Sequence, residues 1–407
     1  MRRVGLLCLP TLIVALLFIP LTRGLLQAEG DSATRPAPLV DARTRAAIAE
    51  GTRFLMSLQQ SDGSWLSDAG KKINSTYKLF PEGKGIPHVG VTGLAVLSLL
   101  AGGHLPGRGP YGAAMDRAVR FLTVNMDEHG YIASGKAGSR TRMYSHAFAT
   151  LALAEVYGVS QQPRLRQKVQ DAIEFTVKCQ NQNGGWRYVP FTNDSDMSVT
   201  VCQIVALRAA RNVGIKVPQA TIDRALGYIL RSAISSEDGS GPAGAYWYQP
   251  HDQRFNRDSF ALCAAGLTAL FQAGLYEDAQ VRAYRDSHDD GRQTPPPPIA
   301  RSVRYMQEQY HEEYARNPDH YFYYYGNYYA AQAMYQLAGH EQGKAMWRRW
   351  YTTVRNHLLQ RARSAKDGDG KRIRYWQSNV DSTHAYATAC ALLVLQFPLD
   401  HLPIHQR

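Results

Sequence analysis

Phe54-Leu55-Met56-Ser57-Leu58-Gln59, followed by Gly63-Ser64-Trp65, is the stretch that decides the fold, because the chain repeats it. The other copies lie at 121–126 with Gly130 and Tyr131, and at 175–180 with Gly184 and Trp186. In each copy a glycine stands nine residues after the phenylalanine, and an aromatic residue follows it. The unit predicts a helix that ends near the glutamine, a glycine in a backbone conformation that other residues avoid, and an aromatic side chain that folds back on the helix.

A second kind of helix is predicted after each turn. The segments 89–101, 147–154, 260–273 and 385–397 are mostly Ala, Leu, Val and Gly. A helix that is apolar all round has to be buried on every side. The segment 41–60 differs, since Arg43, Arg45 and Arg53 give it a polar face. We therefore expect an inner and an outer layer of helices.

Counting an outer and then an inner helix gives six pairs along the chain. They are 41–60 with 89–103, 113–127 with 144–158, 163–181 with 197–213, 220–234 with 258–275, 298–314 with 322–338, and 343–362 with 382–397. An open stack would expose its terminal apolar helices, whereas a closed ring buries all of them. The fold class predicted is all-α, a closed α/α toroid of six helical hairpins in a double-layered barrel, without strands. The segment 277–298, which ends in four prolines, is predicted to be a surface excursion.

The amino terminus is typical of an export signal. Met1-Arg2-Arg3 precedes an apolar stretch at residues 4–21 that is about long enough to span a membrane. We expect residues 1–28 to be a signal peptide or an N-terminal membrane anchor, 29–40 a linker, 41–403 the toroid, and 404–407 a tail. Either form of the leader predicts an exported protein of the periplasm or cell envelope.

Composition argues against several other classes of protein. The five cysteines include no CxxC pair, so neither a disulfide framework nor a zinc ribbon is indicated. The formal net charge is +12, but no run of five Lys or Arg occurs, and we expect no nucleic-acid partner.

The repeated unit resembles the aromatic-glutamine repeat of squalene and oxidosqualene cyclases, whose six-pair barrel is shared with protein prenyltransferase β subunits. The chain looks still closer to exported bacterial proteins with prenyltransferase/squalene-oxidase repeats. The segments that carry this resemblance are Tyr-Ser-His-Ala-Phe-Ala-Thr-Leu at 144–151, Asp-Met-Ser-Val-Thr at 196–200, Tyr-Tyr-Tyr-Gly at 323–326 and Ser-Thr-His-Ala-Tyr-Ala-Thr at 382–388. The resemblance covers about residues 41–403 and implies the toroid fold, but one barrel serves many chemistries.

The inner helices all begin with polar residues, and in a closed ring these starts would share one rim. Residues predicted to line the rim of a ligand-binding cavity are Tyr144, His146, Asp258, Tyr325, Asp381 and His384. A plainer interpretation is that Asp, Ser and Thr at these positions cap free backbone N–H groups. Ten of the 24 tyrosines lie between Tyr305 and Tyr335, and a tyrosine-lined wall would suit a sugar ring or an isoprenoid chain equally.

Asp194-Ser195-Asp196-Met197-Ser198 resembles the Asp-x-Asp-Asp-Thr motif of squalene-type cyclases. The resemblance places Asp196 at the proton-donating position and makes Asp194 a second catalytic candidate. Met197 departs from the motif, since a carboxylate that would assist the acid is missing.

The zinc site of the prenyltransferases is matched only in part. Asp258 and His384 resemble two ligands, but Phe260 stands where the third should be and cannot bind zinc. We expect no metal and no other cofactor.

Three functions remain as hypotheses. The first is a binder of an isoprenoid, lipid or glycan ligand, or of a partner protein. The second is a terpenoid cyclase or prenyltransferase type of enzyme with Asp196 as general acid. The third is a glycan-degrading barrel that uses Asp196 and Asp258 as its pair of carboxylates.

Overall fold

The computed structural model describes residues 38–70, 85–134, 141–235, 242–250, 259–288, 299–315, 319–339 and 341–405. The architecture below is that of the unit Leu39–Arg407. The predicted leader at 1–28, with its apolar stretch at 4–21, and most of the predicted linker lie outside the described residues. In the described part, no helix combines the length and the hydropathy that crossing a membrane requires.

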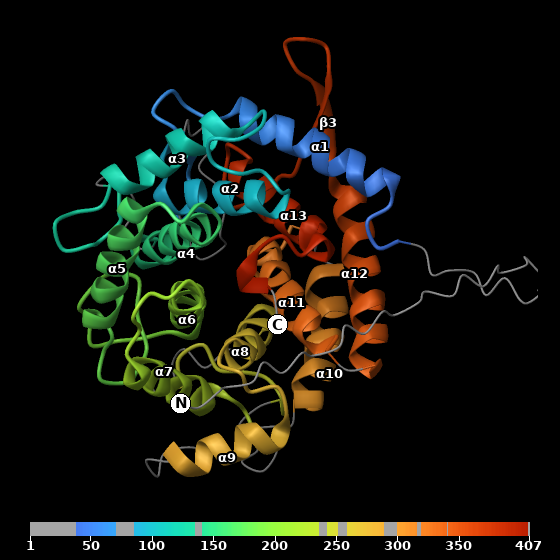
Figure 1. Cartoon of the computed structure of the whole chain (residues 1–407). Helices are drawn as coiled ribbons and strands as arrows, with labels where there is room; N and C mark the ends of the chain where they lie inside the picture. Colours follow the sequence, from blue (N-terminus) through green and yellow to red (C-terminus); the bar gives the residue numbers. More distant parts are fainter. Residues whose placement is uncertain are drawn as a thin grey trace, which may run out of the picture. The chain divides into compact units, whose positions relative to one another are not determined.

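Six inner helices form a closed ring, as Figure 1 shows. They are α2 (Val89–Ala101), α4 (Arg142–Ser160), α6 (Met197–Asn212), α8 (Phe260–Gln272), α11 (Tyr323–Leu337) and α13 (Ala385–Gln396). Each contacts the next in chain order, and α13 contacts α2. All thirteen residues of α2 and all thirteen of α8 are buried. The all-α closed toroid predicted from apolar helices is therefore confirmed.

Six outer helices pack around this ring and carry its polar surface. They are α1 (Ala42–Ser57), α3 (Gly112–Val124), α5 (Pro163–Lys178), α7 (Gln219–Ser232), α10 (Ile299–Gln309) and α12 (Glu341–Arg361). Contacts of α3 with α2 and α4, and of α5 with α4 and α6, show how an outer helix lies over the boundary between two inner ones. Burying the apolar stripe of each outer helix in such a groove closes the second layer.

The repeated tryptophans fold back on the helices that precede them. The indole nitrogen of Trp65 donates to the carbonyl of Leu55 at 2.7 Å, and that of Trp186 donates to the carbonyl of Thr176 at 2.8 Å. Trp376 makes the same bond to Leu358 at 2.8 Å. All three side chains are fully buried. The repeat is thus a structural unit in which one aromatic ring fixes the end of each of these outer helices.

The glutamine and the glycine of the unit tie one pair of helices to the next. The amide of Gln180 donates to the carbonyl of Gly184 at 2.8 Å and to that of Thr221, in α7, at 2.9 Å. Gly184 has a φ of +86°, and a Cβ there would lie 2.2 Å from the carbonyl oxygen of Arg224. Only glycine permits both this backbone conformation and so close an approach.

Four features differ from the sequence-based expectations. Two short antiparallel sheets occur, β1 (Leu66–Ser67) with β2 (Ile86–Pro87) and β3 (Arg363–Lys366) with β4 (Arg372–Tyr375). The predicted excursion at 277–298 contains a helix, α9 (Asp278–His288), that contacts α7. A six-residue π-helix, η2 (Tyr310–Ala315), continues α10, and short 3-10 turns, η3 (Phe397–Leu399) and η4 (Pro403–His405), follow α13.

The fourth difference concerns the predicted tail at 404–407. Ile404 and His405 are buried, and η4 contacts α4, α6 and α11. The backbone N–H of Ile404 lies 3.3 Å from a carboxyl oxygen of Glu155, near the carboxyl end of α4. These two residues therefore belong to the core of the toroid, which closes the ring at the carboxyl ends of its inner helices.

Candidate functional site

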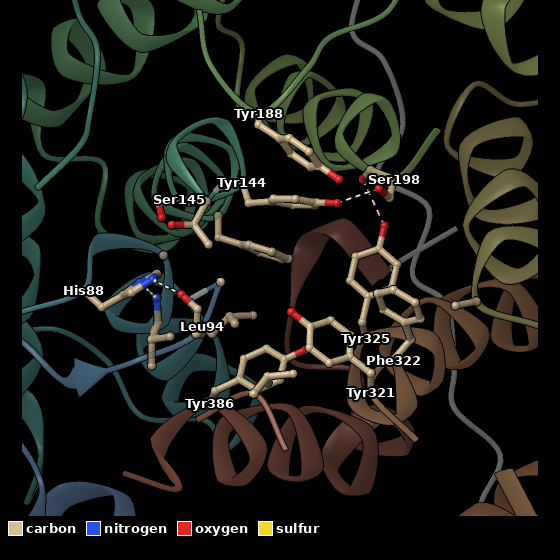
Figure 2. A pocket seen from close by; sticks show the side chains of 18 of the residues that line it. His88, Leu94, Tyr144, Ser145, Tyr188, Ser198, Tyr321, Phe322, Tyr325 and Tyr386 are labelled. Carbon is tan, nitrogen blue, oxygen red and sulfur yellow. Dashed lines mark hydrogen bonds between the residues drawn. The ribbon is translucent and has the colours of Figure 1, made fainter. Parts of the chain in front are cut away.

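A cavity of about 390 Å³ lies at the amino ends of the inner helices (Figure 2). All six inner helices line it with residues of their first two turns or of the positions just before them. These residues include His88, Val91 and Leu94 at α2, Tyr144, Ser145 and Phe148 in α4, Ser198 in α6, Ser259 and Leu262 at α8, Phe322 and Tyr325 at α11, and Tyr386 in α13. The six amino ends therefore surround one space, whose size is typical of small-molecule sites.

The lining is aromatic and uncharged. Six tyrosines contribute to it, namely Tyr144, Tyr188, Tyr248, Tyr321, Tyr325 and Tyr386. None of the described lining residues is an Asp, Glu, Lys or Arg. The pKa of His320, one of two histidines in the wall, is lowered by burial, which favours its neutral form. Such a wall accommodates apolar or flat groups and offers hydroxyls as its polar partners.

The positive ends of the inner helices are largely occupied by the chain's own caps. Side-chain atoms of His88, Asp196 and Ser259 accept the backbone N–H groups of Val91 at 3.2 Å, Val199 at 2.9 Å and Leu262 at 3.2 Å. At the start of α13, Asp381 accepts the N–H of Tyr386 at 2.9 Å. At four of the six amino ends, one backbone donor is therefore used within the protein, which leaves fewer N–H groups for an anion.

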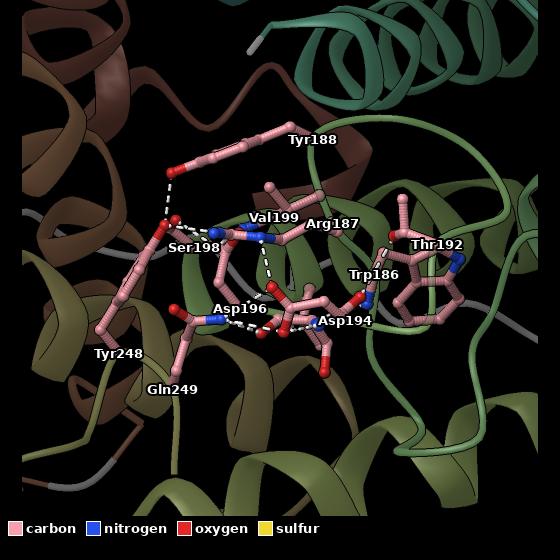
Figure 3. A network of polar contacts seen from close by, with 12 residues as sticks. Trp186, Arg187, Tyr188, Thr192, Asp194, Asp196, Ser198, Val199, Tyr248 and Gln249 are labelled. Atoms are coloured by element: carbon pink, nitrogen blue, oxygen red, sulfur yellow. Dashed lines mark hydrogen bonds and ion pairs between the residues drawn. The ribbon is translucent and has the colours of Figure 1, made fainter. Parts of the chain in front are cut away.

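Asp196 is the centre of a buried polar network beside the cavity (Figure 3). Its side chain is fully buried, and one carboxyl oxygen lies 2.7 Å from the guanidinium of Arg187. The other accepts the hydroxyl of Ser198 at 2.5 Å and the N–H of Val199. Burial raises the pKa of Asp196, while Arg187 and these hydrogen bonds act in the opposite direction. Since three donors converge on this carboxyl group, we assign it the ionised form.

Arg187 joins this network to the tyrosine wall. Its guanidinium lies 3.0 Å from Asp194 and donates to the phenol oxygen of Tyr248 at 2.7 Å. The phenol of Tyr248 is hydrogen-bonded in turn to that of Tyr188, and the guanidinium lies over the Tyr188 ring. The Asp194 side chain is 46% exposed, whereas that of Asp196 is 0% exposed. Arg187 therefore balances one partly solvated and one buried carboxylate.

Ser198 connects the same network to the cavity. The phenol oxygen of Tyr144 lies 2.5 Å from its hydroxyl oxygen. The phenol of Tyr325 donates to its backbone carbonyl at 2.9 Å. Figure 2 shows both tyrosines reaching toward Ser198 from different helices. Asp196 itself is not among the cavity-lining residues, so Ser198 and the tyrosines stand between its carboxyl group and the cavity.

The structure brings some of the predicted rim residues together and separates others. Tyr144 and Tyr325 line the cavity. Asp381 lies behind it, fully buried, and accepts hydrogen bonds from Thr383 and from the N–H of Asp68. His384 is stacked on Tyr375 with ring centroids 5.2 Å apart, outside the lining. The predicted rim residue Asp258 lies outside the described residues.

The placement of His146 on the rim is wrong. Its ring is fully buried on the outer side of α4, where one nitrogen lies 2.9 Å from the hydroxyl of Thr176 in α5. The other nitrogen accepts the N–H of Ile132 at 3.2 Å. Burial lowers the pKa of His146 to about 4, so the ring is neutral. It is a hydrogen-bonded core residue that joins the inner layer to the outer one.

Sequence reasoning did not assign Arg187, Tyr188, Ser198 or Tyr248 to the site. Arg187 and Tyr188 directly follow the repeated Trp186. Tyr248 directly follows Gly244-Ala245-Tyr246-Trp247, a stretch similar to the turn of the repeated unit. The residues that follow each turn of the repeated unit lead toward an inner helix. Their position just after the turn was the sequence signal that could have indicated these site residues. No three His, Cys, Asp or Glu side chains in the described ranges are placed so that they could share a metal ion.

Comparison with known proteins identifies the fold and nothing narrower. No protein-family model matches the chain, and no curated protein matches it in sequence. Solved structures do match it along nearly their whole length. A type II terpene cyclase, MstE from Scytonema, has a TM-score of 0.50 and 14% identity, covering 88% of this chain and 98% of that one. The chain has the α/α toroid fold that this cyclase also has.

Sugar-converting toroids are similar to the same extent. Cellobiose 2-epimerase from Spirochaeta thermophila DSM 6192 has a TM-score of 0.55 and 14% identity, covering 91% of this chain and 99% of that one. The α-1,6-mannanase GH76A of Salegentibacter sp. HEL1_6 has a TM-score of 0.55 and 10% identity, with 88% and 100% covered. The predicted resemblance to terpenoid-cyclase toroids is confirmed for the fold, which ligand-binding proteins and enzymes of several kinds can share.

Proposed function

We propose that this protein binds a neutral isoprenoid or similar lipid chain in the cavity at the amino ends of its inner helices. The observation that carries the proposal is the lining itself, six tyrosines with apolar neighbours and no charged residue among those described. Moving an apolar chain from water to such a wall is favourable, and hydroxyls at one side can bond to a polar end of the chain. We place this binding in the cell envelope, in keeping with the predicted export signal at 1–28.

Two observations favour a neutral ligand over a prenyl diphosphate. A diphosphate needs cations or open helix ends, and the described lining supplies no Lys or Arg. At the helix starts capped by His88, Asp196, Ser259 and Asp381, one N–H group each is already bonded to a side chain of the protein. A glycan substrate is supported less, because glycosidic chemistry requires a pair of carboxylates and the described lining contains none.

An acid-catalysed cyclase remains the second candidate, supported by the burial that raises the pKa of Asp196. Against it, the carboxyl group is paired with Arg187 and lies behind Ser198. A general acid has to reach the atom that it protonates. In this arrangement Asp196 is better explained as a group that holds the tyrosine wall in place.

Calorimetric titration of the full chain tests the proposal. We expect geraniol and farnesol to bind, and geranyl diphosphate to bind more weakly. Ala261→Leu, which fills part of the cavity, should weaken binding of both alcohols at least about tenfold. Ala273→Leu at the other end of the same helix lies outside the lining and is the matched control.

Three outcomes would reject the proposal. In the first, neither geraniol nor farnesol binds. In the second, the Ala261→Leu protein binds both alcohols as tightly as the wild type does. In the third, geranyl diphosphate binds more tightly than the alcohols. Chromatography of farnesol and squalene incubated with the protein tests the second candidate, since turnover that Asp196→Asn abolishes would show an enzyme.

A further inference from the structure

We infer that the cavity selects ligands that donate a hydrogen bond, an alcohol in preference to an ether, an aldehyde or a hydrocarbon of the same chain. This inference rests on the proposed function and narrows it to a chemical class. It follows from which atom accepts each hydroxyl hydrogen in a group of residues that we call the Ser198 cluster. The cluster consists of Ser198, Tyr144 and Tyr325, with Asp196 behind them.

The first step is the direction of the bond between Ser198 and Asp196. The carboxyl group of Asp196 receives the guanidinium of Arg187 at 2.7 Å and the backbone N–H of Val199 at 2.9 Å. A carboxylate so paired accepts hydrogen bonds and has none to give. The hydroxyl of Ser198, 2.5 Å away, therefore donates its single hydrogen to Asp196.

The second step fixes the two tyrosines. Because Ser198 has used its hydrogen, the phenol of Tyr144, 2.5 Å from the serine oxygen, has to be the donor in that contact. The phenol of Tyr325 donates to the backbone carbonyl of Ser198 at 2.9 Å. Each phenol has one hydrogen, so both oxygens keep only lone pairs for a further partner. These two phenols therefore accept hydrogen bonds and have no hydrogen left to donate.

The third step concerns Ser145, which lines the same cavity one residue after Tyr144. Its side chain is 1% exposed, and its hydroxyl has no hydrogen-bond partner among the described residues. A buried hydroxyl without a partner costs free energy, which a ligand oxygen would recover. An alcohol suits the Ser198 cluster because its hydroxyl can give a hydrogen to Tyr144 or Tyr325, which an ether oxygen cannot do.

The ligand series that tests the inference keeps the carbon chain constant. Geraniol, geranyl methyl ether, geranial and the parent ten-carbon hydrocarbon are titrated into the full chain by calorimetry. We expect the alcohol to bind about three- to tenfold more tightly than the ether, which keeps the oxygen but has no hydrogen to give. Equal affinity for alcohol and ether, or tighter binding of geranial, would overturn the inference and leave the proposed function standing. Binding of none of the four would reject the proposed function itself.

Variants locate the preference within the cluster. Tyr144→Phe removes one acceptor, and Ser198→Ala frees the hydrogen of Tyr144 to donate, so in both proteins the ratio of alcohol to ether affinity should fall toward one. Tyr386→Phe is the matched control, because this tyrosine lines the cavity on the side away from Ser198 in Figure 2 and should keep the full ratio. An unchanged ratio in both test variants, or a loss of the ratio in the control, contradicts the assignment. Circular dichroism confirms that each variant is folded.

Discussion

The amino ends of the inner helices surround a cavity, whereas their carboxyl ends are closed by the chain itself. At the closed end, the backbone of Ile404 and His405 meets side chains from three inner helices. Glu155 accepts the N–H of Ile404 at 3.3 Å, and the amide of Gln336 donates to the carbonyl of His405 at 3.1 Å. At the other end, the polar side chains bond mainly to one another and to the helix starts.

The difference concerns the polar groups that a ring of helices buries at its two ends and the partners that they need. Buried polar groups need partners, and at the closed end a peptide segment supplies some of them. One carboxyl oxygen of Glu155, the amide oxygen of Gln336 and one ring nitrogen of His405 still have no partner among the described residues. At the cavity end, Tyr144 and Tyr325 retain acceptor capacity, and the hydroxyl of Ser145 has no partner among the described residues. What distinguishes the cavity end is the space that all six inner helices line, which no peptide segment fills. This end is therefore the one suited to a ligand, and the predictions below test the two ends against each other.

The largest effect is expected for Asp196→Ala at the cavity end. The change removes the cap of α6 and leaves the guanidinium of Arg187 without its buried partner. Breaking a buried pair by removing one member costs about 3–5 kcal/mol. Denaturant titration followed by tryptophan fluorescence measures the free energy of unfolding.

Asp194→Ala is the matched control, since this carboxylate contacts the same guanidinium at 3.0 Å but is 46% exposed. We expect a loss of no more than about 1 kcal/mol. If Asp196→Ala fails to fold, Asp196→Asn, which keeps the shape of the side chain, provides the comparison. Equal costs for the changes at positions 194 and 196 would show that Asp196 does not organise the network.

The layers of the toroid could be predicted from the sequence, whereas the facing of individual residues could not. The repeat at Phe54 and Phe175 fixed the outer helices, and the uncharged segments fixed the inner ones. A helix that is buried on all sides carries no polar stripe to mark its orientation. For this reason the pattern could not tell that His146 faces α5 while Tyr144, two residues earlier, faces the cavity.

The position of the candidate site could be predicted from the sequence, but its network of hydrogen bonds and ion pairs could not. Polar residues at six helix starts indicated a shared rim, and all six inner helices do contribute to one cavity. The position of Arg187 and Tyr248 just after the turns indicated a nearby inner helix, but their contacts with Asp196 and with each other depend on how the turns approach α6 in the folded chain. The hairpin of β3 and β4 was missed although Asp-Gly-Asp-Gly at 367–370 is a turn signal, since the repeat count had assigned that stretch to a connection between helices.

An intermediate effect, which depends on pH, is expected at the closed end. Burial raises the pKa of Glu155 to about 8, from an ordinary value of 4.5. The native protein therefore keeps this proton up to about pH 8, while the unfolded chain releases it near pH 4.5. Because the native state binds more protons in that range, the contribution of Glu155 lowers the free energy of unfolding as pH rises through it.

Glu155→Gln removes this titration and keeps an acceptor for Ile404. The variant should match the wild type below about pH 4 and exceed its free energy of unfolding by about 4 kcal/mol near pH 8. Glu174→Gln on the exposed face of α5 is the control and should leave the pH profile unchanged. A Glu155→Gln profile parallel to that of the wild type would mean that this carboxyl group ionises within the folded ring.

The smallest effect is expected for Ser145→Ala, which returns the comparison to the cavity end. The hydroxyl of Ser145 has no partner among the described residues, and alanine favours a helix more than serine does. The ligand-free variant should therefore be as stable as the wild type or more stable by up to about 1 kcal/mol. Gln336→Ala at the closed end removes a hydrogen bond that is made, and it should lose stability. A loss in Ser145→Ala as large as that in Gln336→Ala would show that the serine hydroxyl is already paired, and Ser145 could then no longer be counted as a donor kept for a ligand.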